Sequence, residues 1–188
     1  MVRASPVVVA ASAAVILAGC TQAVRMHSAT DSTYDTGIRS TFAYAAGVGE
    51  MNTVIVGNPF DLPRDAFERF MTATMRGNHF GPPTTFTTTP SDDARSDYRI
   101  VVTFDTPVGM PKSRLCGPVE DMPRMASSER LGMTTAFCWR DRIISWVDAE
   151  IARPAGPDEG AFRNMVATSM WNLLPTQDHM SSRDDSWL

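Results

Sequence analysis

Two helix-type apolar patterns, set among strand-type patterns, constrain the fold of this chain more than any other feature. In residues 67–75, phenylalanine and methionine recur at the spacing of one helix face, which predicts a helix from about residue 61 to a left-handed stop at Gly77. A second face in residues 162–173 predicts a helix that begins near Asp158. Strand-type patterns lie at 52–56, 84–89, 98–104, 132–139 and 142–151.

The order of these elements is strand, helix, four strands and helix, which places the chain in the α+β class. We expect a single antiparallel or mixed sheet of four to five strands, with two helices packed on one face. Residues 84–89 and 98–104 are expected to pair as one hairpin, and residues 132–139 and 142–151 as another. The segment 41–49 fits either an irregular strand or a loop.

The first twenty residues carry a signal of a different kind. Arg3 precedes an apolar run from Val7 to Ala18, and the run is followed by Gly19 and Cys20. A membrane-spanning helix needs about 20 apolar residues. The shorter run here is typical of a cleaved targeting signal. An ordinary secretory signal with a chance cysteine is the alternative.

The tetrapeptide Leu17-Ala18-Gly19-Cys20 resembles the lipobox of a bacterial lipoprotein signal peptide. The resemblance implies cleavage before Cys20 and a lipid anchor of two or three acyl chains, palmitate among them, on that residue. In Gram-negative lipoproteins, an aspartate directly after the cysteine resembles a signal for retention in the inner membrane. Thr21 stands here, so the outer membrane is expected, with the protein facing the periplasm. The chain then divides into a signal peptide (1–19), a lipidated N-terminus with a flexible tether (20–40), a periplasmic domain (41–175) and a polar tail (176–188).

Two further cysteines, Cys116 and Cys138, remain once Cys20 is assigned to lipid. In an oxidising compartment such an even pair is typical of a disulfide bond. Two free thiols or a metal-binding pair are the alternatives. A disulfide would tie down the proline-rich segment 105–130, which lacks periodicity and is longer than most loops.

Charge and motifs exclude several classes of function. The formal net charge is −4, so the chain lacks the basic excess that nucleic-acid binding requires. It contains no HExxH, GxSxG or SxxK motif and no glycine-rich phosphate loop. We therefore assign no catalytic residue, no cofactor and no metal, and we expect a protein that is not an enzyme.

Three side chains remain as candidates for partner binding. Met122 and Met125 have a spacing that suits a soft metal such as Cu(I), but methionine is also a common filler of apolar cores. Trp146 lies in an expected strand, where an exposed tryptophan is a candidate partner anchor. Cross-strand packing is the alternative for Trp146.

The element order and the lipobox together resemble small lipoproteins that assist envelope assembly or envelope transport. The resemblance implies a non-enzymatic, lipid-anchored accessory or adaptor protein that binds an envelope protein or a lipid. The alternative is a periplasmic ligand-binding lipoprotein, which would hold a small molecule or a soft metal with its 105–131 loop.

Overall fold

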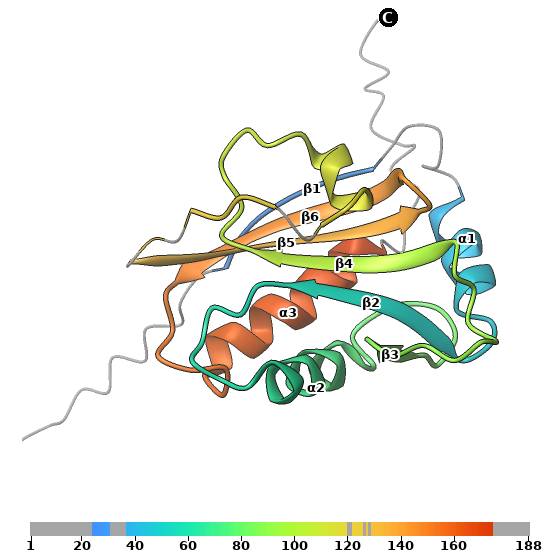
Figure 1. Cartoon of the computed structure of the whole chain (residues 1–188), viewed down its shortest axis with the longest axis horizontal. Helices are drawn as coiled ribbons and strands as arrows, with labels where there is room; N and C mark the ends of the chain where they lie inside the picture. Colours follow the sequence, from blue (N-terminus) through green and yellow to red (C-terminus); the bar gives the residue numbers. More distant parts are fainter. Residues whose placement is uncertain (1–23, 31–36, 120–121, 126, 128, 175–188) are drawn as a thin grey trace, which may run out of the picture.

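The computed structural model describes residues 24–30, 37–119, 122–125, 127 and 129–174, and it confirms the α+β class. Six strands form one sheet in the order β1-β6-β5-β4-β2-β3 (Figure 1). The described residues also form three α-helices, so the expected sheet was too small and one helix was missed. The elements are β1 (Arg25–Thr30), α1 (Ile38–Ala45), β2 (Glu50–Val56), α2 (Arg64–Met75), β3 (Thr85–Thr87), β4 (Tyr98–Phe104), the 3₁₀-helix η1 (Lys112–Cys116), β5 (Arg130–Trp139), β6 (Arg142–Ala152) and α3 (Gly160–Leu173).

The strand β2 lies in the parallel part of a mixed sheet. It pairs in parallel with β3 on one side and with β4 on the other, whereas the remaining neighbours pair antiparallel. The expected hairpin of residues 84–89 with 98–104 is therefore wrong, because β2 lies between the two strands. The other expected hairpin is confirmed, since β5 and β6 pair along their length around the turn at Arg140 and Asp141.

Part of the segment expected to be a tether, residues 20–40, belongs to the sheet. β1 pairs antiparallel with β6, with Arg25 opposite Glu150. It is an edge strand, so backbone pairing to one neighbour holds it while the side chains of Arg25 and His27 stay exposed. A strand of this kind needs no strong apolar alternation, and the tether assignment is corrected for residues 25–30.

A short helix, α1, begins within the expected tether and continues into the segment 41–49, which had fitted either a strand or a loop. Its buried residues Ile38, Phe42 and Ala45 recur at the spacing of one helix face. The helix has eight residues, fewer than the window of about 11–18 in which helical periodicity is recognised. It packs near the end of the sheet at which β2 begins (Figure 1).

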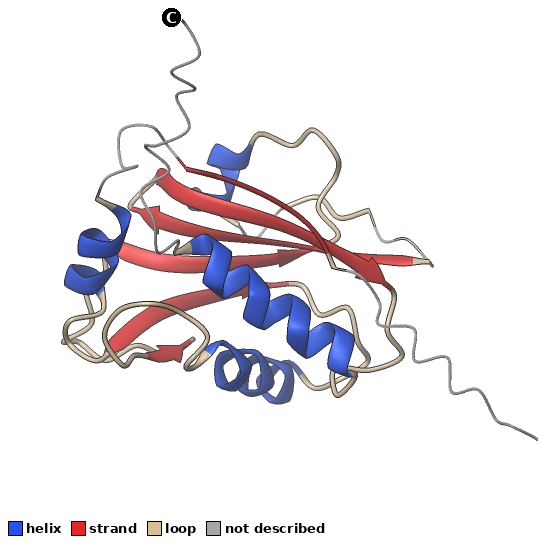
Figure 2. Cartoon of the chain, turned by 180° about the vertical axis from the view of Figure 1, so that it is seen from behind, coloured by secondary structure: helices blue, strands red, loops and turns tan. Residues whose placement is uncertain are grey.

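The helices α2 and α3 cover one face of the sheet, as expected (Figure 2). Phe162 of α3 is fully buried at the centre of this layer. Its ring lies 4.9–6.4 Å, centroid to centroid, from four other rings, which join both helices to the sheet. These rings belong to Phe60, Phe67, Phe70 and Phe104.

The ends of α2 agree only in part with the sequence expectation. The helix begins directly after Pro63 rather than near residue 61, and no side-chain hydrogen bond caps it. Gly77 has a φ of +76° and provides the expected left-handed stop. Within the described residues, no helix combines the length and the apolar character that crossing a membrane requires.

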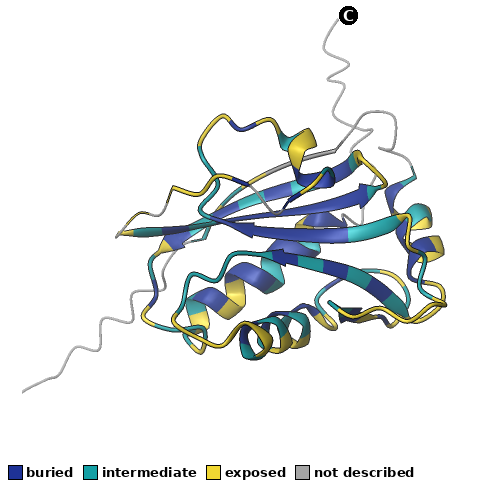
Figure 3. Ribbon diagram, in the orientation of Figure 1, coloured by how far each residue is buried: buried dark blue, intermediate teal, exposed yellow. Residues whose placement is uncertain are grey.

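The described parts of segment 105–129 cover the opposite face of the sheet, over β4, β5 and β6. η1 places Cys116 in a second apolar cluster, against Val101 and Ala136 of the sheet. The expected disulfide is confirmed, because Cys116 is bonded to Cys138 of β5. The central strands are therefore buried on both faces along most of their length, as the dark colour over most of β4 and β5 shows (Figure 3).

Candidate functional site

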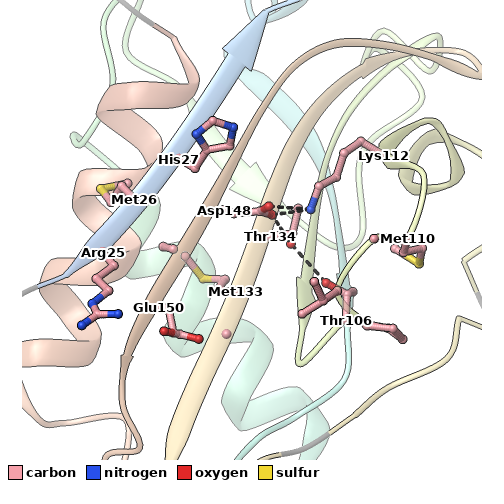
Figure 4. Close-up of a pocket in the computed structure, with 15 residues that line it drawn as sticks. Arg25, Met26, His27, Thr106, Met110, Lys112, Met133, Thr134, Asp148 and Glu150 are labelled. Carbon is pink, nitrogen blue, oxygen red and sulfur yellow. Dashed lines mark hydrogen bonds and ion pairs between the residues drawn. The ribbon is translucent and has the colours of Figure 1, made fainter.

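An open groove of about 420 Å³ lies on the face of the sheet that the 105–129 segment partly covers (Figure 4). β5 and β6 form its floor, β1 forms one wall, and residues 106–112 form the other wall. Hollows of similar volume exist elsewhere on the surface, for example between α2 and α3. The groove differs from them because three strands and the segment tied down by the disulfide converge on it.

The floor of the groove is open because β5 has a glycine at this point. Gly132 lies one residue before Met133, on the face of β5 that also carries Thr134. A Cβ atom built on Gly132 would meet no heavy atom within 4 Å, and the backbone here is not left-handed. Backbone conformation therefore does not require this glycine, and its missing side chain leaves room above the strand.

One connected set of polar contacts crosses the groove. The Nζ of Lys112, the only lysine in the sequence, lies 2.6 Å from a carboxylate oxygen of Asp148 on β6. The hydroxyl of Thr134 donates to the same carboxylate at 2.6 Å, and the hydroxyls of Thr106 and Thr134 are 3.2 Å apart. These contacts hold the 106–112 wall against the floor, so they fix the width of the groove.

Charged and apolar side chains line the rim. On the β1 side, Arg25 and His27 are exposed, and Glu150 on β6 accepts a hydrogen bond from Arg130 of β5. On the opposite rim, Val108 is fully exposed. The rim thus presents charged side chains on the β1 side and an exposed apolar side chain on the side of residues 106–112.

Trp146 lies on the groove face of β6, but its ring is partly covered. Lys112 Nζ is 4.9 Å from the ring centroid, and the His27 ring is 5.4 Å away, centroid to centroid. Regular alternation along β6 would put Ile144 on the same face as Trp146, whereas a bulge in the pairing of β5 with β6 puts Ile144 in the helix-side core. The structure therefore places Trp146 beside the groove and packed between neighbours.

The two candidate methionines have different surroundings. Met122 is buried in the second apolar cluster, only 7% exposed, whereas Met125 is 70% exposed. The pair therefore does not present two accessible sulfur atoms to one metal ion. Cys20, the candidate lipid anchor, lies outside the described residues.

The structure brings together residues that sequence patterns did not single out. Lys112, Thr134 and Asp148 lie far apart along the chain, and only the packing of the disulfide-tied segment on β5 and β6 makes them neighbours. Two weak signals were present in the sequence, namely its single lysine and a glycine as the first residue of an expected strand. Among the described residues, no three His, Cys, Asp or Glu side chains are grouped as a metal site would require.

Comparison with known proteins gives little further guidance. No protein-family model matches the chain, and no curated protein matches it. Two solved structures titled as PelC dodecamers from Paraburkholderia phytofirmans, one of them a point variant, are similar with a TM-score of 0.42 each. They share 13% and 12% identity, cover 81% and 83% of this chain, and are themselves covered to 99%. Likeness at this level does not identify a function.

Proposed function

We propose that the protein is a lipid-anchored accessory protein of the bacterial cell envelope, which binds a protein or lipid partner in the groove and catalyses no reaction. Acyl chains on Cys20 hold it at the outer membrane, facing the periplasm. The lipobox Leu17-Ala18-Gly19-Cys20 supports the anchor. The observation that carries the binding role is the open floor at Gly132, between walls supplied by β1 and by residues 106–112.

The groove has the general character of a binding site. Sites for small ligands are concave, about 300–1,000 Å³ in volume and mostly apolar, with a few placed polar groups. The volume of about 420 Å³ lies in that range. Val108 and Met110 contribute apolar surface, and the ion pair of Lys112 with Asp148 supplies polar groups that can fix the orientation of a bound segment.

Binding is better supported than catalysis. Asp148 is the carboxylate with the most contacts in the groove, and both of its oxygens lie 2.6 Å from the ammonium of Lys112. One of these oxygens also accepts a hydrogen bond from Thr134. A general base must reach a proton of its substrate, and the existing partners occupy this carboxylate instead.

The second candidate is a periplasmic ligand-binding lipoprotein that holds a small molecule in the same groove. The volume of the groove favours this alternative. The soft-metal form of the alternative gains no support, because Met122 is buried in an apolar cluster while Met125 projects into solvent. The chemical class of the molecule bound in the groove distinguishes the two candidate functions.

Site-specific photo-crosslinking in living cells tests the proposed function. A benzophenone amino acid at position 27 replaces His27, which is exposed on the β1 wall. The matched control carries the same amino acid at position 164, in place of Asn164, which is exposed on α3 away from the groove. We expect one dominant adduct from position 27 and none of that mass from position 164.

The mass of the adduct decides between the candidates. An envelope protein or a lipid bound at position 27 supports the accessory role, and a small metabolite supports the ligand-binding alternative. Equal labelling from positions 27 and 164 would contradict a binding role for the groove.

A further inference from the structure

The first described residue lies close in sequence to the proposed anchor. Val24, which directly precedes β1, lies four positions after Cys20, with three residues between them. A fully extended chain spans at most about 3.6 Å per residue, so this connection reaches about 14 Å. β1 is paired with β6 from its first residue, Arg25. A lipid on Cys20 would therefore hold the sheet itself near the bilayer, rather than a domain on a long tether.

The pairing of the strands shows which loops share the end of the sheet at which β1 begins. Arg25 is opposite Glu150 near the end of β6, and Glu150 is opposite Gly132 near the start of β5. Met133 of β5 is opposite Phe104, the last residue of β4. β2 ends at the same side because it runs parallel to β4. The loops after β2, β4 and β6 and the segment before β5 therefore emerge together, at the left of Figure 1.

Exposed apolar side chains gather in these loops. Of the five large apolar side chains exposed in the described residues, Leu62, Val108 and Met125 belong to this end. Val108 is fully exposed and Met125 is 70% exposed. Single exposed apolar residues are ordinary on a protein surface. Their place on three adjacent loops beside the proposed anchor gives them a common explanation, because apolar side chains are favourable at a lipid interface.

Two arginines at this end have no carboxylate partner within the described part of the structure, and the guanidinium of one of them, Arg124, lies against Gly57. Arg25 at the start of β1 and Arg124 in the segment before β5 make no ion pair or side-chain hydrogen bond there, and both are exposed. Basic side chains near an anionic leaflet are attracted to it. Asp61 and Glu129 are exposed carboxylates in the same loops and offset part of that attraction. The exposed apolar side chains of these loops therefore make the main contact with the membrane.

We infer that this end of the sheet rests on the phospholipid surface, with Val108 and Met125 inserted among the headgroups and Arg25 and Arg124 near lipid phosphates. The inference rests on the proposed lipid anchor and adds the orientation of the domain. Val108 also lies on the rim of the groove. The groove then opens at the membrane surface, within reach of a lipid or of the membrane-proximal part of a protein.

Fluorescence quenching in vesicles tests the orientation. The acylated full-length mature protein is reconstituted into phosphatidylcholine–phosphatidylglycerol vesicles, with one added cysteine that carries an environment-sensitive dye. The test variant is Val108→Cys and the matched control is Val48→Cys. Val48 is a second exposed valine, just before β2 and so at the opposite end of the sheet. β2 is seven residues long, so about 20 Å of sheet separates the two ends.

Brominated lipids should quench most of the emission of the dye at position 108 and leave the emission at position 48 unchanged. Unquenched emission at position 108, or equal quenching at both positions, in protein that floats with the vesicles would overturn the inference and leave the anchor standing. Protein that fails to float would overturn the anchor, and the orientation inferred from it would fall as well. Flotation and quenching thus separate the two failures.

Discussion

Replacing Cys20 with alanine is expected to release the protein from the membrane completely. In the proposed anchor, acyl chains are attached only to Cys20, and the apolar run before it is too short to span a bilayer. Each buried methylene contributes about 0.8 kcal/mol, so one short chain binds marginally while two or three bind stably. The variant loses all of them. Incorporation of labelled palmitate and fractionation of cells measure the effect.

Thr21→Ala is the matched control for this variant. It changes the neighbouring residue and leaves the four lipobox residues intact, so we expect normal palmitate incorporation and normal membrane attachment. Palmitate that persists in Cys20→Ala would contradict the anchor. It would favour an ordinary secretory signal, and the orientation of the domain at the bilayer would lose its basis.

Removing the disulfide should destabilise the folded domain by about 3 kcal/mol. The bond joins residues 22 apart in sequence, Cys116 in η1 and Cys138 in β5, and both are buried. Without it, the unfolded chain gains the entropy of an open loop. The folded chain must also hold the 105–129 segment by apolar packing and by the contacts of the Arg99 guanidinium with the carbonyls of Cys116 and Gly117. Urea unfolding of the double variant Cys116→Ala/Cys138→Ala measures the change in the free energy of unfolding.

Ser113→Ala is the matched control for the double variant, because Ser113 is exposed in the same short helix. A surface change of this kind alters the free energy of unfolding by no more than about 0.5 kcal/mol. A loss of less than about 1 kcal/mol in the double variant would mean that packing alone holds the segment. The wall of the groove would then not depend on the bond.

Strong local patterns allowed most of the sheet and two of the helices to be predicted. Residues 98–104 form β4 with the expected bounds, because their alternating apolar residues face the helix-side core. α2 and α3 follow from apolar faces that repeat over more than two turns. The alternation of β5 and β6 around a two-residue turn predicted their pairing.

The features that were missed depend on contacts between distant parts of the chain. The polar edge strand β1 forms by pairing with β6, about 120 residues away along the chain. The position of β2 between β3 and β4 is likewise a matter of topology, which local periodicity does not report. The groove depends on both, because β1 is one wall and Lys112 meets Asp148 only in the folded sheet.

Filling the groove tests the central claim most directly. Gly132→Phe places a ring above the floor of the groove, where a Cβ meets no atom within 4 Å. Gly160→Phe is the matched control, because Gly160 is exposed at the start of α3 and a Cβ there is equally free. The measurement is the yield of the adduct captured from position 27 in each background, with the melting temperature of each variant. We predict loss of the adduct in Gly132→Phe alone, at an unchanged melting temperature. An undiminished yield in Gly132→Phe would contradict the claim that the groove is the binding site.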